Sequence, residues 1–80
     1  MTTEPIPAFR SLVAEAVRIV GSQTRLAELM DRSQQQVSTL CTKAERISAE
    51  DAVAIERATS GQVPRWRLRP DLWDAPAEAA

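Results

Sequence analysis

Two short stretches with helical periodicity follow each other across a gap of only three residues, and this spacing constrains the fold more than any other feature. The stretches cover residues 23–30 and about 34–42, and residues 31–33 separate them. A serine stands at the cap position before each stretch, Ser22 for the first and Ser33 for the second. A connection this short forces the two helices to cross sharply and leaves the second one standing out from the body.

The residues of the two stretches fit such a crossing. Ala27 provides a small side chain where the first helix faces the second, and Asp31 occupies the turn. A turn of this kind often needs a positive φ, which Asp adopts more readily than most residues other than Gly. Apolar contacts at the crossing come from Leu26, Met30, Val37 and Leu40. Together these features predict a helix-turn-helix.

The rest of the chain also predicts helices, and it shows no strand or hairpin signal. A first helix is expected over residues 7–20, where apolar residues recur every three or four positions until Gly21 ends the pattern. A fourth is expected over about residues 49–60, closed by Gly61, and a further turn starts with Pro64 in its first position. The sequence therefore predicts an all-α fold, a compact bundle of four to five helices that contains the helix-turn-helix.

Two patterns predict capping boxes, in which a serine and the residue three positions later satisfy each other's backbone N–H groups. Ser33 and Gln36 form one of them at the start of the third helix, and Ser48 and Asp51 form the other before the fourth. The side chain of Gln36 is therefore expected to be occupied within the protein.

Composition excludes several classes of protein. The chain has 10 Lys and Arg against 11 Asp and Glu, a net charge of −1, which argues against coating nucleic acid by bulk electrostatics. It has no His and a single Cys, so the commonest metal ligand is absent and no internal disulfide can form. No apolar run approaches the roughly 20 residues of a membrane span, and the start of the chain lacks a secretory signal. We expect a cytoplasmic domain that is not an enzyme and binds no metal, cofactor or membrane.

Three segments are expected along the chain: an N-terminal arm over residues 1–6, the helical domain over residues 7–73 and a flexible acidic tail over residues 74–80. Charge is distributed unevenly, because 10 basic residues face only 8 acidic ones when residues 70–80 are left aside, a net of +2. This balance favours modest, salt-sensitive binding to nucleic acid over indiscriminate binding.

The run QTRLAELMDRSQQQVS, residues 23–38, resembles the helix-turn-helix of phage repressors and Cro, whose usual pattern is Q-x-x-L-A-x-x-L-G-x-S-Q-x-x-V-S. The main departure is Asp31 in place of the glycine at the turn. Residues 54–61 together with the ending RPDLW at residues 69–73 resemble the YdaS subgroup of Cro-like regulators. The resemblance covers about residues 8–73 and implies a small DNA-binding protein of phages or prophages, a group in which some members are described as antitoxins.

The second helix of such a motif lies in the major groove with its first residues against base edges. The side chains predicted to contact bases are Gln34, Gln35, Ser38 and Thr39. A Gln amide can bond adenine N6 and N7 together, while Ser and Thr hydroxyl groups can meet any base. The resemblance further implies that Gln34, as the first Gln of this helix, reads a base. The alternative for these polar residues is an ordinary solvated helix face.

Phosphate contacts are predicted from helix starts, where free N–H groups and the helix dipole favour anions, and from nearby cations. The predicted residues are Ser22, Gln23, Arg25, Arg32, Ser33, Thr42 and Lys43. The serines act first as caps, and the resemblance implies a phosphate contact for Gln23. Lys43 has a second interpretation as a cation at the C-terminal end of the helix dipole, and a solvated surface position is the alternative for each arginine.

The segment over residues 63–73 combines basic and aromatic residues and has two interpretations. One is an arm that touches phosphates through Arg65, Arg67 and Arg69. We favour the other, in which apolar side chains fold back over the first and fourth helices and leave the arginines solvated, because a small Ala-rich core needs its large residues. The residues expected in this lid over the core, or in a dimer interface, are Val63, Trp66, Leu68, Leu72 and Trp73.

These observations predict a sequence-specific regulator of the Cro and repressor type that binds double-stranded DNA as a homodimer on a palindromic operator, with half-sites about 34 Å apart. Two alternatives stay open. One is an antitoxin that binds its own operator and a toxin protein, and the other is a protein-interaction module that keeps the fold without binding DNA. The expected setting is a bacterial or phage-infected cell, and Cys41 is expected to be a small core or boundary residue.

Overall fold

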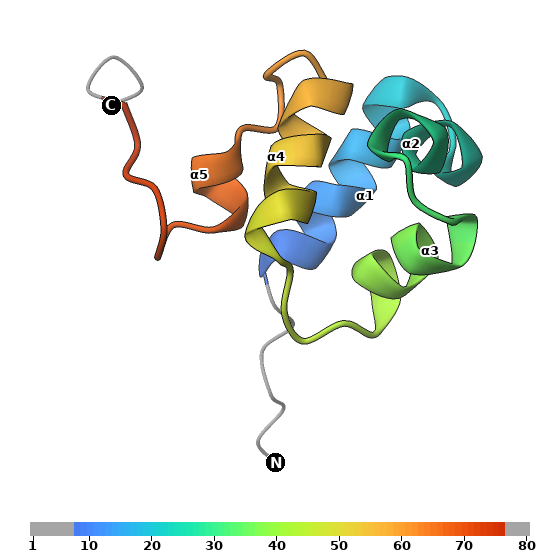
Figure 1. The fold of residues 1–80 in the computed structure, drawn as a ribbon, viewed down its shortest axis with the longest axis horizontal. Coiled ribbons are helices and arrows are strands. Elements are labelled where there is room, and N and C mark those ends of the chain that lie inside the picture. Colours follow the sequence, from blue (N-terminus) through green and yellow to red (C-terminus); the bar gives the residue numbers. More distant parts are fainter. Residues whose placement is uncertain (1–7, 77–80) are drawn as a thin grey trace.

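The computed structural model describes residues 8–76, and this part of the chain folds into helices without any strand (Figure 1). The helices are α1 (Ala8–Val20), α2 (Gln23–Met30), α3 (Gln34–Thr42), α4 (Ala49–Ala58) and α5 (Arg65–Leu68). The predicted all-α fold of four to five helices is thereby confirmed. The predicted arm over residues 1–6 lies outside the described residues, as do Pro7 and the end of the predicted tail, residues 77–80.

The arrangement of the helices separates α3 from α5. α1 contacts all four other helices, and α4 packs against α1, α2 and α5. α3 packs on α1 and α2 and does not contact α4 or α5. Figure 1 shows α5 on one side of the α1 and α4 pair, with α2 and α3 on the other side. The predicted helix-turn-helix therefore forms one flank of the molecule, and the C-terminal segment forms the opposite flank.

A single core receives buried apolar side chains from all five helices and from the two connections beside α4. Its members are Phe9, Leu12, Val13, Ala16, Leu26, Ala27, Met30, Val37, Leu40, Ile47, Ala52, Ile55, Val63 and Leu68. The residues predicted to form the crossing of the second and third helices are all among them. Burial of these residues fixes α2 and α3 against α1, because each apolar side chain removed from water contributes on the order of 1.5–3 kcal/mol.

The serines before α3 and α4 act as predicted caps, but only one of the two capping boxes closes. Ser33 Oγ accepts from the Gln36 N–H at 3.1 Å, and Gln36 Oε1 accepts from the Ser33 N–H at 2.8 Å. Ser48 Oγ accepts from the Asp51 N–H at 3.0 Å in the same way. The Asp51 carboxylate does not return this bond, because it accepts from Arg32 at 3.0 Å instead. The prediction of a second complete box is therefore wrong.

The end of α4 comes earlier than the sequence predicts. The helix ends at Ala58, and both Ser60 (φ 53°) and Gly61 (φ 84°) adopt the left-handed region. Two positive φ angles in succession cannot continue a right-handed helix, so the chain turns here toward α5. Pro64 is the residue before the last helix and not its first residue, because its extended ψ of 153° lies outside the helical region.

The C-terminal segment folds back against α1 and α4, as predicted, and most of its apolar side chains take part. Val63 is fully buried and Leu68 is 4% exposed. Trp73 is half-buried and packs against the core, and Trp66 is half-buried as well. Leu72 is 48% exposed, so its predicted place over the core is wrong, and its alternative place in a dimer interface stays a prediction. In the turn after Arg69, the N–H groups of both Leu72 and Trp73 donate to the Arg69 carbonyl, and Trp73 rather than Leu72 packs against the core.

The arginines of this segment are not simply solvated. Arg65 donates from Nη2 and Nε to Glu56 Oε1 at 2.7 and 2.9 Å, and its guanidinium lies 5.4 Å from the centre of the Trp73 ring. These bonds from Arg65 hold the pKa of Glu56 below its usual value. Arg69 forms a two-pronged pair with Asp71 at 2.9 and 2.7 Å. The expectation of solvated arginines is wrong for these two, whereas Arg67 is exposed.

Candidate nucleic-acid interface

The outer face of α3 carries polar side chains over its first turns. Gln34 and Gln35 are exposed, and Ser38 and Thr39 are half-buried. Val37 on the opposite side is fully buried, so it fixes which face of the helix points outward. The structure thus brings all four predicted base-contact residues onto one short helix, with the two glutamines at its most exposed end.

The three consecutive glutamines of α3 are in different situations. The amide oxygen of Gln36 is occupied by the Ser33 N–H in the capping box. Gln35 Nε2 donates to Thr39 Oγ1 over 3.5 Å, at the outer limit of a hydrogen bond. Within residues 8–76 the side chain of Gln34 has no hydrogen-bond partner, so its amide is free to bind a ligand.

The turn between α2 and α3 has the backbone that the sequence predicts. Asp31 adopts the left-handed conformation, with φ 57° and ψ 47°, and its N–H donates to the Glu28 carbonyl at 3.2 Å. The next N–H, from Arg32, donates to the Ala27 carbonyl at 2.9 Å. These bonds satisfy two of the carbonyls that the end of a helix leaves free. Asp31 therefore adopts the left-handed turn conformation at the position where the pattern of phage repressors and Cro has glycine.

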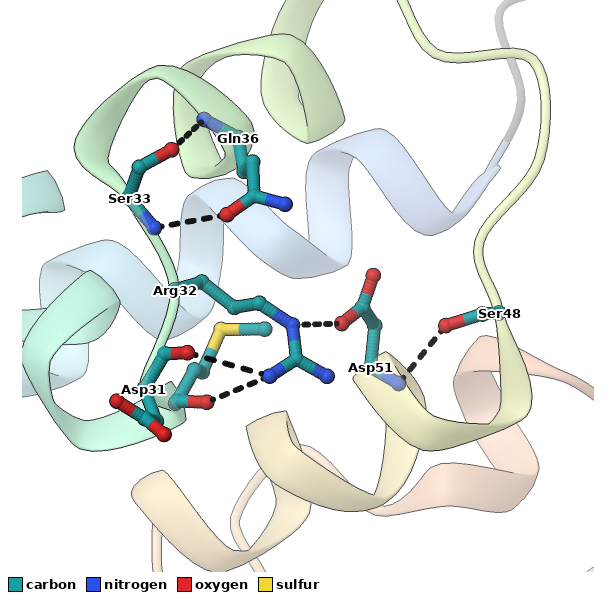
Figure 2. Close-up of polar contacts among 7 residues, drawn as sticks. Asp31, Arg32, Ser33, Gln36, Ser48 and Asp51 are labelled. Atoms are coloured by element: carbon teal, nitrogen blue, oxygen red, sulfur yellow. Dashed lines mark hydrogen bonds and ion pairs between the residues drawn. The ribbon is translucent and has the colours of Figure 1, made fainter.

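Arg32 has intramolecular partners at the position where a phosphate contact was predicted. Its Nε donates to Asp51 Oδ1 at 3.0 Å, and its Nη1 donates to the carbonyls of Met30 and Asp31 at 3.3 and 3.2 Å. Figure 2 shows the guanidinium between the end of α2 and the first turn of α4. The side chain thus points into the protein, and its charge is compensated there.

The rear end of α3 is held by a residue that the sequence did not single out. Arg10 of α1 donates from Nη2 to the Lys43 carbonyl at 2.8 Å and from Nε to the Ala44 carbonyl at 2.7 Å. The Lys43 N–H caps the helix through the Thr39 carbonyl at 2.9 Å, and its side chain is exposed. The Lys43 ammonium therefore stays available on the surface while its backbone is fixed.

A further arginine, Arg69, holds the chain after α3 through a bond that the sequence did not predict. Arg69 Nη1 donates to the Ile47 carbonyl at 2.7 Å, just before the cap of α4. Its acceptor, like those of Arg10, is a backbone carbonyl more than twenty positions away in the sequence. Every residue has such a carbonyl, so no pattern of residue types could have identified these bonds.

The other residues predicted to contact phosphate have mixed surroundings. Ser22 Oγ accepts from the Arg25 N–H at 3.0 Å and so acts as a cap, and the Arg25 side chain is exposed. Gln23 is half-buried at the start of α2. Thr42 Oγ1 donates back to the Ser38 carbonyl at 2.8 Å. Arg46, after α3, is exposed as well, and it lines a cavity together with Leu68, Arg69 and Asp71 of the C-terminal segment.

The single cysteine lies on the inner side of α3. Cys41 is half-buried and packs against the core, which agrees with the expected boundary position. Burial raises the pKa of its thiol. A thiol with a raised pKa carries little thiolate at neutral pH, so it is a poor nucleophile.

The described residues contain no group of three or more side chains arranged to hold a metal ion. None of the helices over residues 8–76 has both the length and the apolar character needed to cross a membrane. Two large apolar side chains, Ile19 of α1 and Leu29 of α2, are 36% and 43% exposed. The apolar spacing of residues 23–30 predicts Leu29 on the inner face of the helix, and this prediction is wrong.

Most of the chain matches a known family. Residues 13–76 match the family described as bacterial toxin YdaS. The chain is also similar to a protein of Escherichia coli (strain K12) named "Putative transcriptional regulator YdaS", with 38% identity over 58 residues. The aligned part is 72% of this chain and 59% of that protein, so the chain spans about three fifths of the relative's length. No solved structure matches the chain significantly.

Proposed function

The chain belongs to the bacterial toxin YdaS family, and on this premise we propose that it is a transcriptional regulator that binds specific sequences of double-stranded DNA through α3. The observation that carries the proposal is the exposed start of α3. Gln34 and Gln35 present amides there that the protein barely uses, and such amides are suited to adenine in the major groove. The name of the E. coli relative, a transcriptional regulator, supports the same role.

The charges favour a binding mode that depends on base contacts. Arg32, Arg65 and Arg69 are paired with carboxylates, and Arg10 donates to backbone carbonyls. Few cations near α3 are left for phosphates, so the salt-dependent affinity for any DNA should be modest. A homodimer on a palindromic operator, with half-sites about 34 Å apart, would double the number of base contacts and supply the missing affinity.

Selection of bound sequences from random double-stranded DNA at low salt tests the proposal. The selected DNA and a scrambled version of it are then titrated by fluorescence anisotropy with the parent protein and with Gln34→Ala. We expect Gln34→Ala to lose about 1–3 kcal/mol of discrimination between the two DNAs. Gln62→Ala makes the same chemical change at an exposed residue outside α3 and should leave discrimination unchanged. A parent protein that binds both DNAs equally would contradict the proposal.

A second candidate function is that of an antitoxin that binds its operator and also a toxin protein. The exposed Leu72 beside the half-buried Trp73 favours it, because an apolar side chain at this place is open to a protein partner. Co-expression with the product of the adjacent gene, followed by purification, tests this function. Loss of a co-purified complex in Leu72→Asp, with Arg67→Asp as the exposed control on the same segment, would support it. Purification without any complex would exclude a stable partner of this origin.

A further inference from the structure

The ion pair between Arg32 and Asp51 links the helix-turn-helix to the rest of the domain. We propose that these two residues are positioning residues, which hold the start of α3 at the angle that base discrimination requires, and that Arg32 does not contact DNA. The inference rests on the proposed function, because it assigns the ion pair a role in DNA reading by α3. It concerns Arg32 and Asp51, which join α2 to α4, and not the residues on the outer face of α3.

The Arg32 guanidinium joins the end of α2 to the first turn of α4. One nitrogen, Nη1, donates to the carbonyls of Met30 and Asp31 at the end of α2, and Nε donates to Asp51 in α4. The terminal carbonyls of α2 would otherwise lack partners, and a cation is favoured at this end of a helix. The side chains of the pair are only 29% and 20% exposed, so water screens their attraction less than at the open surface.

The acceptor of this bond is itself fixed. Asp51 lies in the first turn of α4, where its N–H is bonded to Ser48 Oγ at 3.0 Å. A carboxylate is favoured at this position by the helix dipole. Figure 2 shows that hydrogen bonds connect Ser48 to Asp51 and Asp51 to Arg32, with the Arg32 side chain extended toward α4. Asp51 therefore gives the turn a rigid point of attachment.

The position of this link in the fold makes it relevant to α3. α3 packs on α1 and α2 and makes no contact with α4. Arg32 is followed directly by Ser33, the cap of α3, whose N–H and hydroxyl are both bonded to Gln36. A rotation of the turn would therefore be passed to the first turn of α3, which carries the exposed glutamines. The ion pair connects α4 to this point through a few bonded groups.

The alternative role of Arg32 as a phosphate ligand makes an opposite prediction for one variant. If Arg32 left Asp51 to bind a phosphate, Asp51→Asn would release the cation and tighten binding to every DNA sequence. If the pair positions α3, Asp51→Asn should reduce discrimination without adding a phosphate contact. Any loss of a negative charge reduces repulsion from DNA, so a matched control is needed. Glu50→Gln removes an equal charge from an exposed residue in the same turn of α4.

The test compares the parent chain, Asp51→Asn and Glu50→Gln on the selected and scrambled DNAs over a range of salt concentrations. We expect Asp51→Asn to lower the ratio of the two affinities about tenfold, the equivalent of roughly one base contact, with an unchanged salt slope. Glu50→Gln should leave the ratio unchanged. Tighter binding to both DNAs and a steeper salt slope in Asp51→Asn than in Glu50→Gln would overturn the proposal.

Amide hydrogen exchange of the free protein separates this inference from the proposed function. Asp51→Asn should speed exchange about tenfold at the N–H groups of Ser33, Gln36 and Val37, while those of α1 keep their parent rates. Unchanged exchange in the first turn of α3 would overturn the positioning role. If the parent chain shows no preference for any DNA sequence, the proposed function fails, and the exchange rates still decide whether the ion pair holds α3.

Discussion

α3 and α5 are both short helices on the flanks of the α1 and α4 pair, and arginines hold both of them in different ways. At α3 the arginines come from outside the helix: Arg10 donates to backbone carbonyls just after its last residue, and Arg32 donates to carbonyls at the end of α2, before the turn that leads into it. At α5 the arginine belongs to the helix itself, and Arg65 pairs through its side chain with Glu56. Because α3 is held through backbone groups outside the helix, its own side chains stay available to bind a ligand. The side chains that attach α5 are not available in this way.

This difference separates two basic regions that look alike in the sequence. The cluster over residues 65–69 contains three arginines, yet Arg65 and Arg69 are compensated by carboxylates in the structure. The region around α3 has fewer cations, but Lys43 is exposed. Density of arginine along the chain is thus a poor guide to where positive charge remains available. The predictions that follow test the comparison, from the largest expected effect to the smallest.

Removal of the buried anchor of α5 should have the largest effect. Leu68→Ala is expected to lower the free energy of unfolding by about 2–5 kcal/mol, because it leaves a cavity at a residue that is 4% exposed. Leu72→Ala is the matched control, and a change within about 0.5 kcal/mol is expected because its side chain is 48% exposed. Denaturant unfolding measures both. Equal losses in the two variants would mean that α5 is not seated on the core by Leu68.

Removal of the Glu56 carboxylate should weaken the attachment of α5 by less. Glu56→Gln loses charge-assisted bonds to the Arg65 guanidinium, and partial exposure to water reduces their contribution to about 1.5 kcal/mol. Because the pKa of Glu56 is lowered in the folded state, its contribution is complete above the usual value of 4.5 and is lost as the pH falls through the lowered one.

The pH dependence provides the check. Stability curves of the parent protein and of Glu56→Gln should differ at pH 7 and converge in acid below pH 4.5. Two curves that stay parallel as the pH falls would show that the Arg65 bonds do not account for the lowered pKa.

On the α3 flank, loss of an exposed cation should affect DNA binding and leave stability unchanged. Lys43→Ala is expected to weaken binding to all sequences alike by about 1 kcal/mol at 0.1 M salt and to reduce the salt slope by about 0.9. Arg67→Ala removes an exposed cation from α5 and should change neither quantity. Anisotropy titrations at four or more salt concentrations measure the slopes. Equal changes in the two variants would make α5 part of the DNA-binding surface.

The smallest expected effect concerns the turn before α3. Asp31→Gly removes the cost of a left-handed conformation in a residue with a Cβ, at the expense of greater chain entropy in the unfolded state. We expect a gain of about 0.5 kcal/mol in the free energy of unfolding, with base discrimination unchanged. Thermal and denaturant unfolding measure the gain. A loss of stability would mean that the Asp31 side chain contributes more than its backbone conformation suggests.

The sequence was sufficient for those features that depend on neighbours along the chain. The bounds of α2 and α3 follow from serine caps and apolar spacing, and the left-handed Asp31 follows from the length of the turn. The Ser33 and Gln36 box involves residues three positions apart, and the structure contains it as predicted. Each of these features is decided within one or two helical turns.

Features that depend on distant partners escaped prediction. Asp51 has the spacing of a capping-box residue, but Arg32, 19 positions earlier, takes its carboxylate. Arg10 bonds to carbonyls 33 and 34 positions away, which no residue pattern marks. The sequence alone could therefore not show which side chains of the candidate site lack an intramolecular partner.

The half-buried thiol of Cys41 makes the seating of α3 measurable in the unmodified protein. Because burial raises the pKa of this thiol, its reaction with a disulfide reagent should be slow while α3 stays packed against α1. Each transient departure of the helix from the core exposes the sulfur further, so a faster reaction in a variant than in the unmodified protein reports weaker seating of the helix on the core. With a single cysteine in the chain, that rate reports on α3 alone.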